Sequence, residues 1–367
     1  MPTLPAPPVA PQLPPADGPP VVAPDAAGLA RAAALLKSNQ VCAFPTETVY
    51  GLGASALSTA AVERIYALKG RPKYNPLIVH VASAEAAEAL AGAWPASAAR
   101  LAAALWPGPL TMVVPRGPRI PAMVSAGRDT MALRVPAHPV ALALLQACGL
   151  PLAAPSANRS ESVSPTTAQH VARSLPAVPL ILDGGPCQLG IESTVVDLTC
   201  SPPRLLRPGA LPVRALRALL PDLEVPSLAA SLGPEPTASS QEEDTTARAA
   251  PGMMSRHYAP RAVLHLLPEA ALQAELSNLV AASSPARHLR LGLLCYRSLP
   301  DLASHCAHVE QLPDDPLGYA ADLYAALHRL DDAGVDVILA VRPPDARAED
   351  ADWLAISDRL QRAAAKV

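Results

Sequence analysis

Two stretches of alternating strand-like and helix-like patterns flank a segment at residues 221–260 that contains Pro, Ser, Thr and acidic residues with little periodicity. This alternation is the strongest constraint on the fold, because short apolar strands separated by helices favour a sheet covered by helices. The 367 residues exceed the size of one compact core. We therefore expect two α/β domains joined by a linker at 221–260.

The domain at residues 26–220 is expected to form a twisted mixed sheet with flanking helices. Strands are predicted at 41–44, 77–81, 110–114, 131–135, 152–154, 180–182, 194–198 and 204–206. Helices are predicted at 29–36, 60–68, 84–91, 97–105, 139–148, 166–174 and 212–219. The preceding residues 1–25 are rich in Pro and Ala and are predicted to be a disordered tail.

The domain at residues 261–367 is expected to be a smaller, Rossmann-like α/β unit with a parallel sheet. Predicted strands and helices alternate in the order 263–267, 270–280, 291–295, 317–330, 335–341 and 350–365. The G-x-G-x-x-G fingerprint is missing here, so dinucleotide binding is not predicted.

Charge, hydropathy and cysteine spacing exclude several classes of protein. A net charge of −3 disfavours a general nucleic-acid binder but allows a local basic pocket for a small anion. Neither a long apolar run nor a signal-peptide pattern is present, so we expect a cytoplasmic protein without a membrane span. The six cysteines form no C-x-x-C pair, and the group at 305–308 lacks a second ligand cluster, so no metal site is predicted.

Polar residues gather in loops that follow predicted strands and helices, where binding sites usually lie. The loop at 45–53 carries two threonines and a glutamate, which suits either a small polar ligand or a simple turn. After the next helix, Lys69, Arg71 and Lys73 lie within five residues. Such cations suit a phosphate group, but they also suit a solvated helix C-terminus.

Charged and small residues within or beside later strands are further site candidates. Arg134 lies inside an apolar strand, where a buried guanidinium needs an anionic partner. His80 also interrupts an apolar strand, although a lone histidine there is usually a satisfied core residue. The small residues at 153–158 would let the backbone approach a ligand closely. Ser164 precedes Pro165 and equally fits a helix N-cap.

Together these segments resemble the YrdC-type domain of L-threonylcarbamoyladenylate synthases. In the family's order, the matching segments are FPTETVYGLG, KGRPKYNPLIVH, LWPGPLT, ALRVPAHP, APSANRSESVSPT, LDGG, GIESTVVDL and LLRPG, which cover about 30–215. The segment APGMMSRHYAP at 250–260 resembles the linker end of the long, two-domain form. Within it, Met254 and Ser255 stand where the family carries a basic and an aromatic residue.

The resemblance implies a sheet-lined cleft that binds ATP and L-threonine side by side. It implies that Lys69 and Arg71 are the catalytic residues, which stabilise charge on the phosphates in the transition state. The residues implied around L-threonine are Thr46, His80, Arg134, Ala154 and Ser193. Those implied around ATP are Lys69, Arg71, Asn75, Thr130, Ser156, Asn158, Ser164, Arg207 and Tyr258. Tyr258 is implied to fold over the cleft and exclude water.

The implied reaction joins L-threonine, bicarbonate and ATP into threonylcarbamoyl-AMP and pyrophosphate. The product would serve the N6-threonylcarbamoyladenosine modification of tRNA beside the anticodon, through a separate tRNA threonylcarbamoyl-transferase. Mg²⁺ would be held through the ATP phosphates, since the sequence shows no acidic cage for it. No covalent nucleophile is expected.

Two other functions fit a domain of this type. A double-stranded RNA or tRNA-binding module is disfavoured by the acidic net charge and by the 3% aromatic content. The carbamoyl-adenylate chemistry of hydrogenase maturation proteins uses a similar domain, but those proteins carry zinc-finger cysteine pairs that this sequence lacks.

Overall fold

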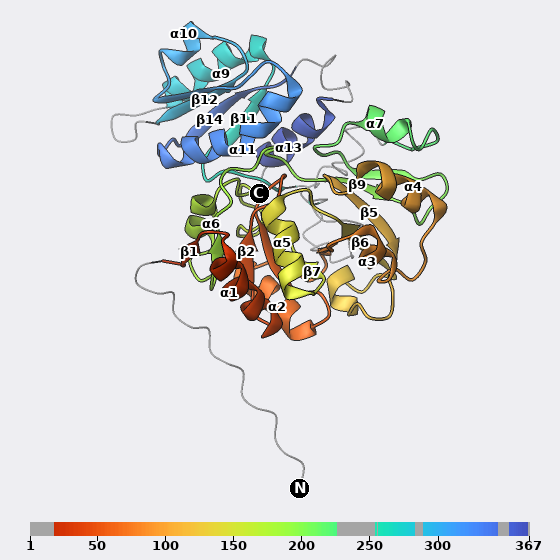
Figure 1. The fold of residues 1–367 in the computed structure, drawn as a ribbon. Helices are drawn as coiled ribbons and strands as arrows, with labels where there is room; N and C mark the ends of the chain where they lie inside the picture. Colours follow the sequence, from red (N-terminus) through yellow and green to blue (C-terminus); the bar gives the residue numbers. More distant parts are fainter. Residues whose placement is uncertain (1–17, 226–253, 255, 283–288, 344–351, 366–367) are drawn as a thin grey trace.

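A computed structural model describes residues 18–225, 254, 256–282, 289–343 and 352–365. Figure 1 shows a larger lobe formed by the N-terminal part of the chain, with a smaller lobe from residue 261 onward above it. Each lobe contains its own sheet with helices packed on it, so the predicted α/β class with two sheets is confirmed. No helix in the described part of the chain is long and apolar enough to cross a membrane.

The larger lobe is built on a ten-stranded sheet with the order β1-β8-β2-β3-β7-β4-β6-β5-β9-β10. Its strands are β1 (Val21–Val22), β2 (Cys42–Phe44), β3 (Gly51–Ser55), β4 (Ile78–His80), β5 (Leu110–Pro115), β6 (Thr130–Arg134), β7 (Leu152–Ala153), β8 (Ile181–Leu182), β9 (Thr194–Asp197) and β10 (Arg204–Arg207). β6 pairs parallel with β4 and antiparallel with β5, which makes the sheet mixed, as predicted.

Helices cover both faces of this sheet. They are α1 (Ala26–Lys37), α2 (Thr59–Lys69), α3 (Ala84–Glu88), α4 (Ala96–Leu105), α5 (Pro139–Cys148), α6 (Ala168–Ser174) and α7 (Val213–Arg217), with a 3-10 turn η1 (Ala122–Ser125). Side chains alternate between the two faces along a strand. On β2, Cys42 and Phe44 therefore pack with α1 and α5, while Ala43 belongs to the cluster that includes α2.

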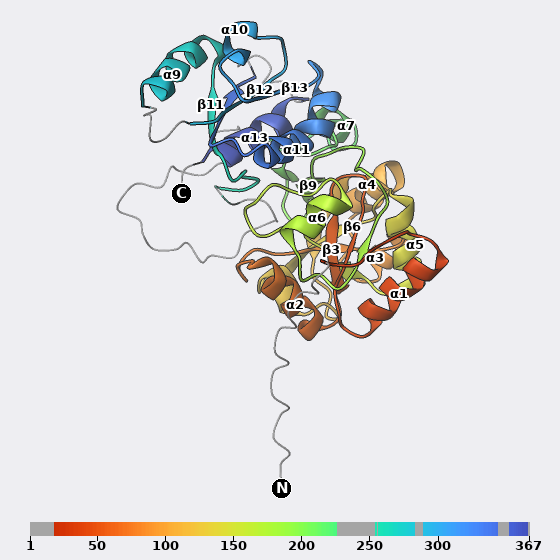
Figure 2. The same ribbon diagram turned by 90° about the vertical axis from the view of Figure 1, so that its left-hand side faces the viewer.

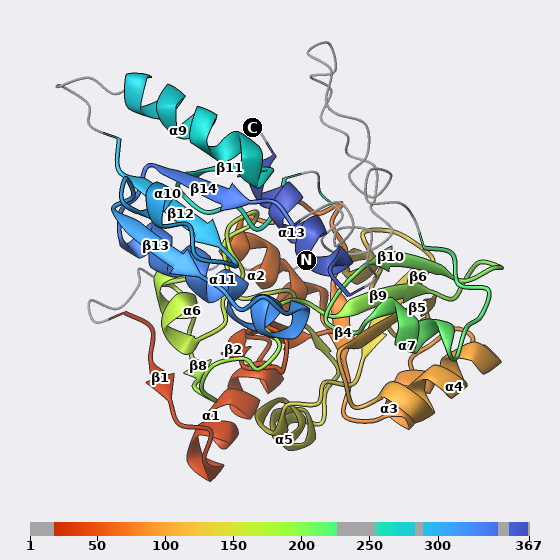
Figure 3. The same ribbon diagram turned by 90° about the horizontal axis from the view of Figure 1, so that it is seen from above.

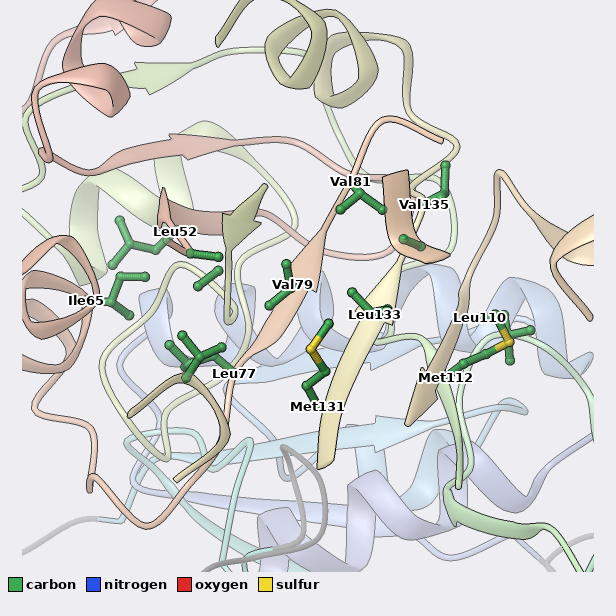
Figure 4. Close-up of a cluster of buried hydrophobic side chains, with 14 of the residues drawn as sticks. Leu52, Ile65, Leu77, Val79, Val81, Leu110, Met112, Met131, Leu133 and Val135 are labelled. Carbon is green, nitrogen blue, oxygen red and sulfur yellow. The ribbon is translucent and has the colours of Figure 1, made fainter. Parts of the chain in front are cut away.

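The same alternation on β4 and β6 separates the core from the polar face of the sheet. Figure 4 shows the core side, where Val79, Met131 and Leu133 are buried among other apolar side chains. Burial of each such side chain contributes roughly 1.5–3 kcal/mol. The alternate residues His80 and Arg134 are partners in the β4–β6 register and so share the opposite face. The alternation of apolar residues along β4 and β6 thus places His80 and Arg134 side by side on the other face.

The smaller lobe contains a four-stranded, fully parallel sheet with the order β11-β14-β12-β13. Its strands are β11 (Val263–Leu267), β12 (Leu291–Cys295), β13 (His308–Gln311) and β14 (Val337–Val341). Its helices are α9 (Glu269–Ala282), α10 (Pro300–Ala303), α11 (Pro316–Asp332) and α13 (Leu354–Ala364). The predicted parallel α/β unit is confirmed, with β13 as an additional edge strand.

Helices α11 and α13 lie on the side of the smaller lobe that faces the larger one (Figures 2 and 3). Gly190 of the larger lobe approaches α11 so closely that a Cβ atom there would lie 2.3 Å from the carbonyl oxygen of Ala321. Gly190 also has a φ of 70°, which favours glycine. The two lobes therefore pack so closely that the backbone of Gly190 contacts the backbone of α11.

Two local predictions differ from the structure. Residues 51–53, interpreted as part of a loop, belong to β3, because pairing with β2 and β7 outweighs the low strand propensity of glycine. The predicted tail at 1–25 is wrong at Val21–Val22, which pair with β8 as β1. Residues 1–17 of that tail, and 226–253 and 255 of the predicted linker, lie outside the described residues.

Candidate active site

A polar pocket lies on the face of the large sheet that carries His80 and Arg134. It is lined by Thr46, Thr48, Val49, Gly51, Arg71, Ile78, His80, Arg134, Ala154, Pro155, Ser156, Glu192, Ser193, Arg207, His257 and Tyr258. All the residues predicted around L-threonine are among them, as are four of those predicted around ATP. Segments that are distant in sequence therefore converge on one cavity.

Arg134 projects into this pocket from the end of β6. Its Nη2 donates to Oε1 of Glu47 at 2.6 Å, its Nη1 to the Thr48 hydroxyl at 3.0 Å and its Nε to the Gly108 carbonyl at 3.3 Å. The anionic partner that a buried arginine requires is thus Glu47, which the sequence had not assigned to the site. A guanidinium has five N–H groups. Counting partners among the described residues, one N–H on each terminal nitrogen remains for a ligand.

The charges around Arg134 set the protonation of its neighbours. Burial raises the pKa of Glu47, but the charge and hydrogen bond of Arg134 outweigh this and hold it below its ordinary value. Burial and the charge of Arg134 lower the pKa of His80 to about 3, so its imidazole is neutral at pH 7. The His80 Nδ1 has no hydrogen-bond partner among the described residues. It is therefore a candidate ligand contact rather than a satisfied core histidine.

The loop after β2 forms a compact hydroxyl turn. The Thr46 hydroxyl accepts from the backbone N–H groups of Thr48 and Val49, at 3.2 Å each, and donates to the Val49 carbonyl at 2.6 Å. Such a Thr turn is typical of a short side chain that caps its own backbone. The turn and the ligand-binding interpretations of this loop are thus compatible, since the same residues line the pocket.

The basic segment after α2 is buried rather than solvated. Helix α2 ends at Lys69 and is capped by Gly70, whose φ of 60° turns the chain into the site. Arg71 lines the pocket and donates to the carbonyls of Asn75 and Pro76. Burial lowers its pKa to about 10. The interpretation as a solvated helix end is therefore wrong for Lys69 and Arg71 and fits the exposed Lys73.

Lys69 lies behind the pocket wall rather than in the lining. Its Nζ donates to the carbonyls of Ser156 and Asn158 at 2.6 and 2.5 Å, and to the Asn158 side-chain oxygen at 3.3 Å. Burial and the charge of Arg71 lower its pKa well below the ordinary value. Asn158 in turn accepts from the Ser156 hydroxyl. Lys69 and Asn158 thus hold Ser156 at the pocket edge.

Arg207 and Ser193 form the opposite wall. The Arg207 guanidinium donates to the Ser193 carbonyl at 2.8 Å and to its hydroxyl at 3.2 Å. The Thr111 hydroxyl lies 2.8 Å from the same hydroxyl. Burial lowers the pKa of Arg207 from its ordinary value. Together with Arg71, this places two guanidinium groups on the pocket.

Besides Lys69 and Asn158, three more predicted ATP contacts lie outside the lining. Asn75 is buried beside it and contacts the sulfur of Met254 at 3.3 Å. The Ser164 hydroxyl donates to Glu192 at 2.6 Å and so supports the wall from behind. Thr130 is half-buried at the start of β6, roughly 13 Å along the strand from Arg134 at about 3.3 Å per residue. An extended ligand would be needed to reach it.

The segment at 256–260 contributes two residues to the pocket lining. Ala259 forms a bridge with Ser162 and donates to the carbonyl of Glu161 at 2.8 Å. Tyr258, with a φ of 62°, and His257 both line the pocket, and their rings lie 4.0 Å apart. His257 was missed by the sequence interpretation, although it adjoins Tyr258.

The donor set does not match a protein-bound metal ion. Among the described residues, no group of three or more His, Cys, Asp or Glu side chains could hold one. The two carboxylates nearest the pocket, Glu47 and Glu192, are each paired with an arginine. The site instead concentrates positive charge, which suits a polyanionic ligand.

Comparison with known proteins decides the family. Residues 34–209 match the Sua5/YciO/YrdC model, described as telomere recombination, and residues 213–365 match the model of the threonylcarbamoyl-AMP synthase C-terminal domain. The threonylcarbamoyl-AMP synthase of Pyrococcus abyssi is 40% identical over 90% of this chain and 92% of its own. This chain belongs to the two-domain threonylcarbamoyl-AMP synthase family.

Other members of the family agree in sequence and in fold. The threonylcarbamoyl-AMP synthase of Bacillus subtilis is 41% identical over 92% of both chains. A crystal structure of Pyrococcus abyssi Sua5 complexed with L-threonine superposes with a TM-score of 0.79, at 39% identity, over 92% of this chain and 94% of the other. The similarity therefore includes both lobes.

Proposed function

We propose that this chain forms threonylcarbamoyl-AMP and pyrophosphate from L-threonine, bicarbonate and ATP. The observation that carries the proposal is that one pocket contains two groups of residues. Arg134, with N–H groups still available, lies beside the neutral His80, and this group suits an amino acid. Arg71 and Arg207 line the same pocket, and these two arginines suit a polyphosphate. The relatives' activity and the L-threonine complex of the archaeal neighbour support the same assignment.

The amino-acid subsite is proposed at Arg134, His80 and the Thr46 turn. The two remaining N–H groups of Arg134, one on each terminal nitrogen, match the two oxygens of a carboxylate. Glu47 orients the fork, and the neutral His80 can hydrogen-bond the ligand without adding charge. Ser193 and the backbone at Ala154 complete this subsite. The methyl group of L-threonine would distinguish it from L-serine by roughly 10- to 200-fold.

The nucleotide subsite is proposed at Arg71, Arg207 and Ser156, supported by Lys69 and Asn158. The threonine amine attacks the carbon of bicarbonate, water leaves, and a carbamate forms. An oxygen of that carbamate then attacks the α-phosphorus of ATP, and the bond to pyrophosphate breaks. Negative charge that develops on the phosphate oxygens would be stabilised by the guanidinium of Arg71, while Lys69 holds Ser156 in place from behind the wall. Buried, oriented donors need little reorganisation for this step.

Mg²⁺ would accompany ATP rather than bind to the protein. The arginine-rich lining and the paired state of Glu47 and Glu192 leave no carboxylate cage among the described residues. The ion would supply charge neutralisation on the phosphates when bound. The remaining contributions come from the positioning of the two substrates by the chain's own residues.

The product is an activated carbamoyl group, and we propose that it passes to a tRNA threonylcarbamoyl-transferase in the cytoplasm. An acyl-phosphate link of this kind hydrolyses in water, so exclusion of water from the pocket is useful. His257 and Tyr258, which line the pocket, are proposed to provide this exclusion. Direct contact with tRNA belongs to the same proposal, as a property of the downstream step.

The test is a reconstitution with purified protein, ATP, Mg²⁺, labelled bicarbonate and single amino acids. We expect L-threonine to yield both pyrophosphate and labelled adenylate, with L-serine much poorer. Arg71→Ala should abolish both products, whereas Lys73→Ala, an exposed cation in the same loop, should leave them unchanged. Background pyrophosphate from folded wild-type protein with L-threonine would refute the proposed function.

A further inference from the structure

The wall of the pocket at Glu192 is completed by the smaller lobe. Glu192 is buried in the loop before β9, and its Oε1 accepts from the Ser164 hydroxyl. Its Oε2 accepts from the Tyr324 hydroxyl of α11 at 2.9 Å and from Nε of Arg359 of α13 at 3.0 Å. Both carboxylate oxygens of a pocket residue are thus engaged, one of them by two side chains of the other lobe.

Arg359 joins three parts of the site at once. Its side chain is 1% exposed, and besides Glu192 its Nη1 donates to the carbonyl of Pro208, next to the pocket arginine Arg207. Its guanidinium carbon lies 5.1 Å from the centre of the Tyr258 ring. This distance is within the range of a cation–π interaction. Arg359 therefore contacts Glu192, the backbone beside Arg207 and the Tyr258 ring, without lining the pocket itself.

The same two helices hold the covering residues. The Tyr258 ring stacks on Tyr324 with centres 5.6 Å apart. The backbone N–H of His257 donates to the carbonyl of Arg362 at 3.3 Å. The orientation of His257 and Tyr258 over the pocket is thus set by α11 and α13 as well as by their own segment.

We propose that Arg359 is a positioning residue for the reaction: it neutralises Glu192 on the pocket wall and seats Tyr258 over the pocket, so that the smaller lobe completes the nucleotide subsite. This inference rests on the proposed function. Its physical basis is that a polyphosphate must enter beside a buried carboxylate. Paired with Arg359, that carboxylate is compensated; unpaired, it would repel the phosphates and compete for Arg207.

The electrostatics of the wall support this role. Burial raises the pKa of Glu192, but the charges of Arg359 and Arg207 and the hydrogen bond from Ser164 lower it to about 2. Glu192 is therefore ionised at every pH at which the protein would be assayed. Arg359 also donates to Asp358 at 2.8 Å, but Asp358 accepts from Arg362 at 2.9 Å as well and so keeps a partner when Arg359 is replaced. Glu192 would be the carboxylate that loses its paired cation.

The test compares Arg359→Met with the double variant Glu192→Gln/Arg359→Met in the pyrophosphate assay. We expect Arg359→Met to raise KM for ATP by about tenfold or more, a size consistent with coupling between contacting residues. The double variant removes the uncompensated charge and should recover most of that loss. Arg359→Lys, which keeps the charge, should be less impaired than Arg359→Met. A double variant no better than the single one would overturn the proposal.

A matched control separates this role from general contact between the lobes. Arg214 pairs with Asp352 across the lobes but is exposed and does not line the pocket. Arg214→Met should leave KM for ATP unchanged. Equal effects of Arg214→Met and Arg359→Met would show loss of docking rather than of charge compensation, against the proposal.

The pH profile gives a readout that a purely structural role would not move. In Arg359→Met the pKa of Glu192 rises towards the assay range, so ATP binding should improve as the pH falls and Glu192 becomes protonated. Wild type and the double variant should show no such recovery. A single-variant profile parallel to wild type would overturn the proposal.

Hydrogen exchange distinguishes failure of this inference from failure of the proposed function. Peptides covering 256–260 should exchange faster in Arg359→Met than in wild type, whatever reaction the chain catalyses. Unchanged exchange there would contradict the seating of Tyr258. Wild-type protein without threonine-dependent pyrophosphate would instead refute the proposed function, which the charge-compensation role requires.

Discussion

Replacing Gly190 by alanine should loosen the contact between the two lobes. A Cβ atom at this position would lie 2.3 Å from the carbonyl oxygen of Ala321 and 2.4 Å from that of Ala320, both in the backbone of α11. Backbone in a helix cannot rotate away as a side chain can, so one lobe must shift relative to the other. The loop that carries Glu192 would move with Gly190.

The expected loss of stability in Gly190→Ala has two separable contributions. The φ of 70° at Gly190 costs a residue with a Cβ about 1–2 kcal/mol. Overpacking against fixed atoms adds roughly 1–3 kcal/mol. Gly149 is a matched control, because its φ is 63° and a Cβ there meets nothing within 4 Å. Gly149→Ala should therefore show the conformational cost alone.

Thermal unfolding and limited proteolysis together measure the effect. We expect Gly190→Ala to lose about 1–3 kcal/mol more than Gly149→Ala, which is roughly 2–12 °C in Tm at 2–4 °C per kcal/mol. Proteolysis should accelerate at the junction between the lobes, and threonine-dependent pyrophosphate formation should fall. Equal Tm values for the two variants would refute the close approach of Gly190 to α11.

Three further outcomes are expected. Arg134→Met should raise KM for L-threonine and, by leaving Glu47 buried without its cation, lower the free energy of unfolding by about 3–5 kcal/mol; if Glu47→Gln/Arg134→Met is no more stable in urea unfolding, the pairing is not the cause. Burial and nearby cations lower the pKa of His170 to about 3, so the unfolded chain binds more protons than the folded one between about pH 6.5 and 3. The free energy of unfolding should therefore fall as the pH drops through that window. His170→Gln should flatten this pH dependence in urea titrations, and an unchanged slope would assign it to other groups. Asp25 caps α1 by accepting from a backbone N–H at 2.8 Å, so Asp25→Ala should cost about 1 kcal/mol in chemical unfolding, while Asp25→Asn should cost less.

Much of the architecture could be predicted from local patterns. Apolar runs with period two or 3.6 placed most strands and helices of both lobes, because those periods follow directly from backbone geometry. They failed at residues 51–53, where glycine lowers strand propensity, and at residues 21–22, where only pairing with a distant strand creates β1. Local propensity does not include a partner strand.

The candidate site was also only partly predictable from the sequence. The apolar neighbours of Arg134 predict that it is buried in a strand. A buried charge without a partner is costly, so they also predict an anionic partner. That the anion is Glu47 was not readable, because the two are 87 residues apart and meet only when β6 is placed near the loop after β2. The register that sets His80 against Arg134 was equally invisible before the strand order was known.

The contribution of the second lobe was the least predictable. Arg359 lies 167 residues from Glu192, in a helix whose sequence carries no motif of the site. Strand period, helix period and turn chemistry are properties of short segments, so the order of residues along the chain determines them. The way the lobes dock decides which charges neutralise one another inside the folded molecule. A desolvated charge needs a partner, and only the tertiary packing brings that partner within hydrogen-bonding distance.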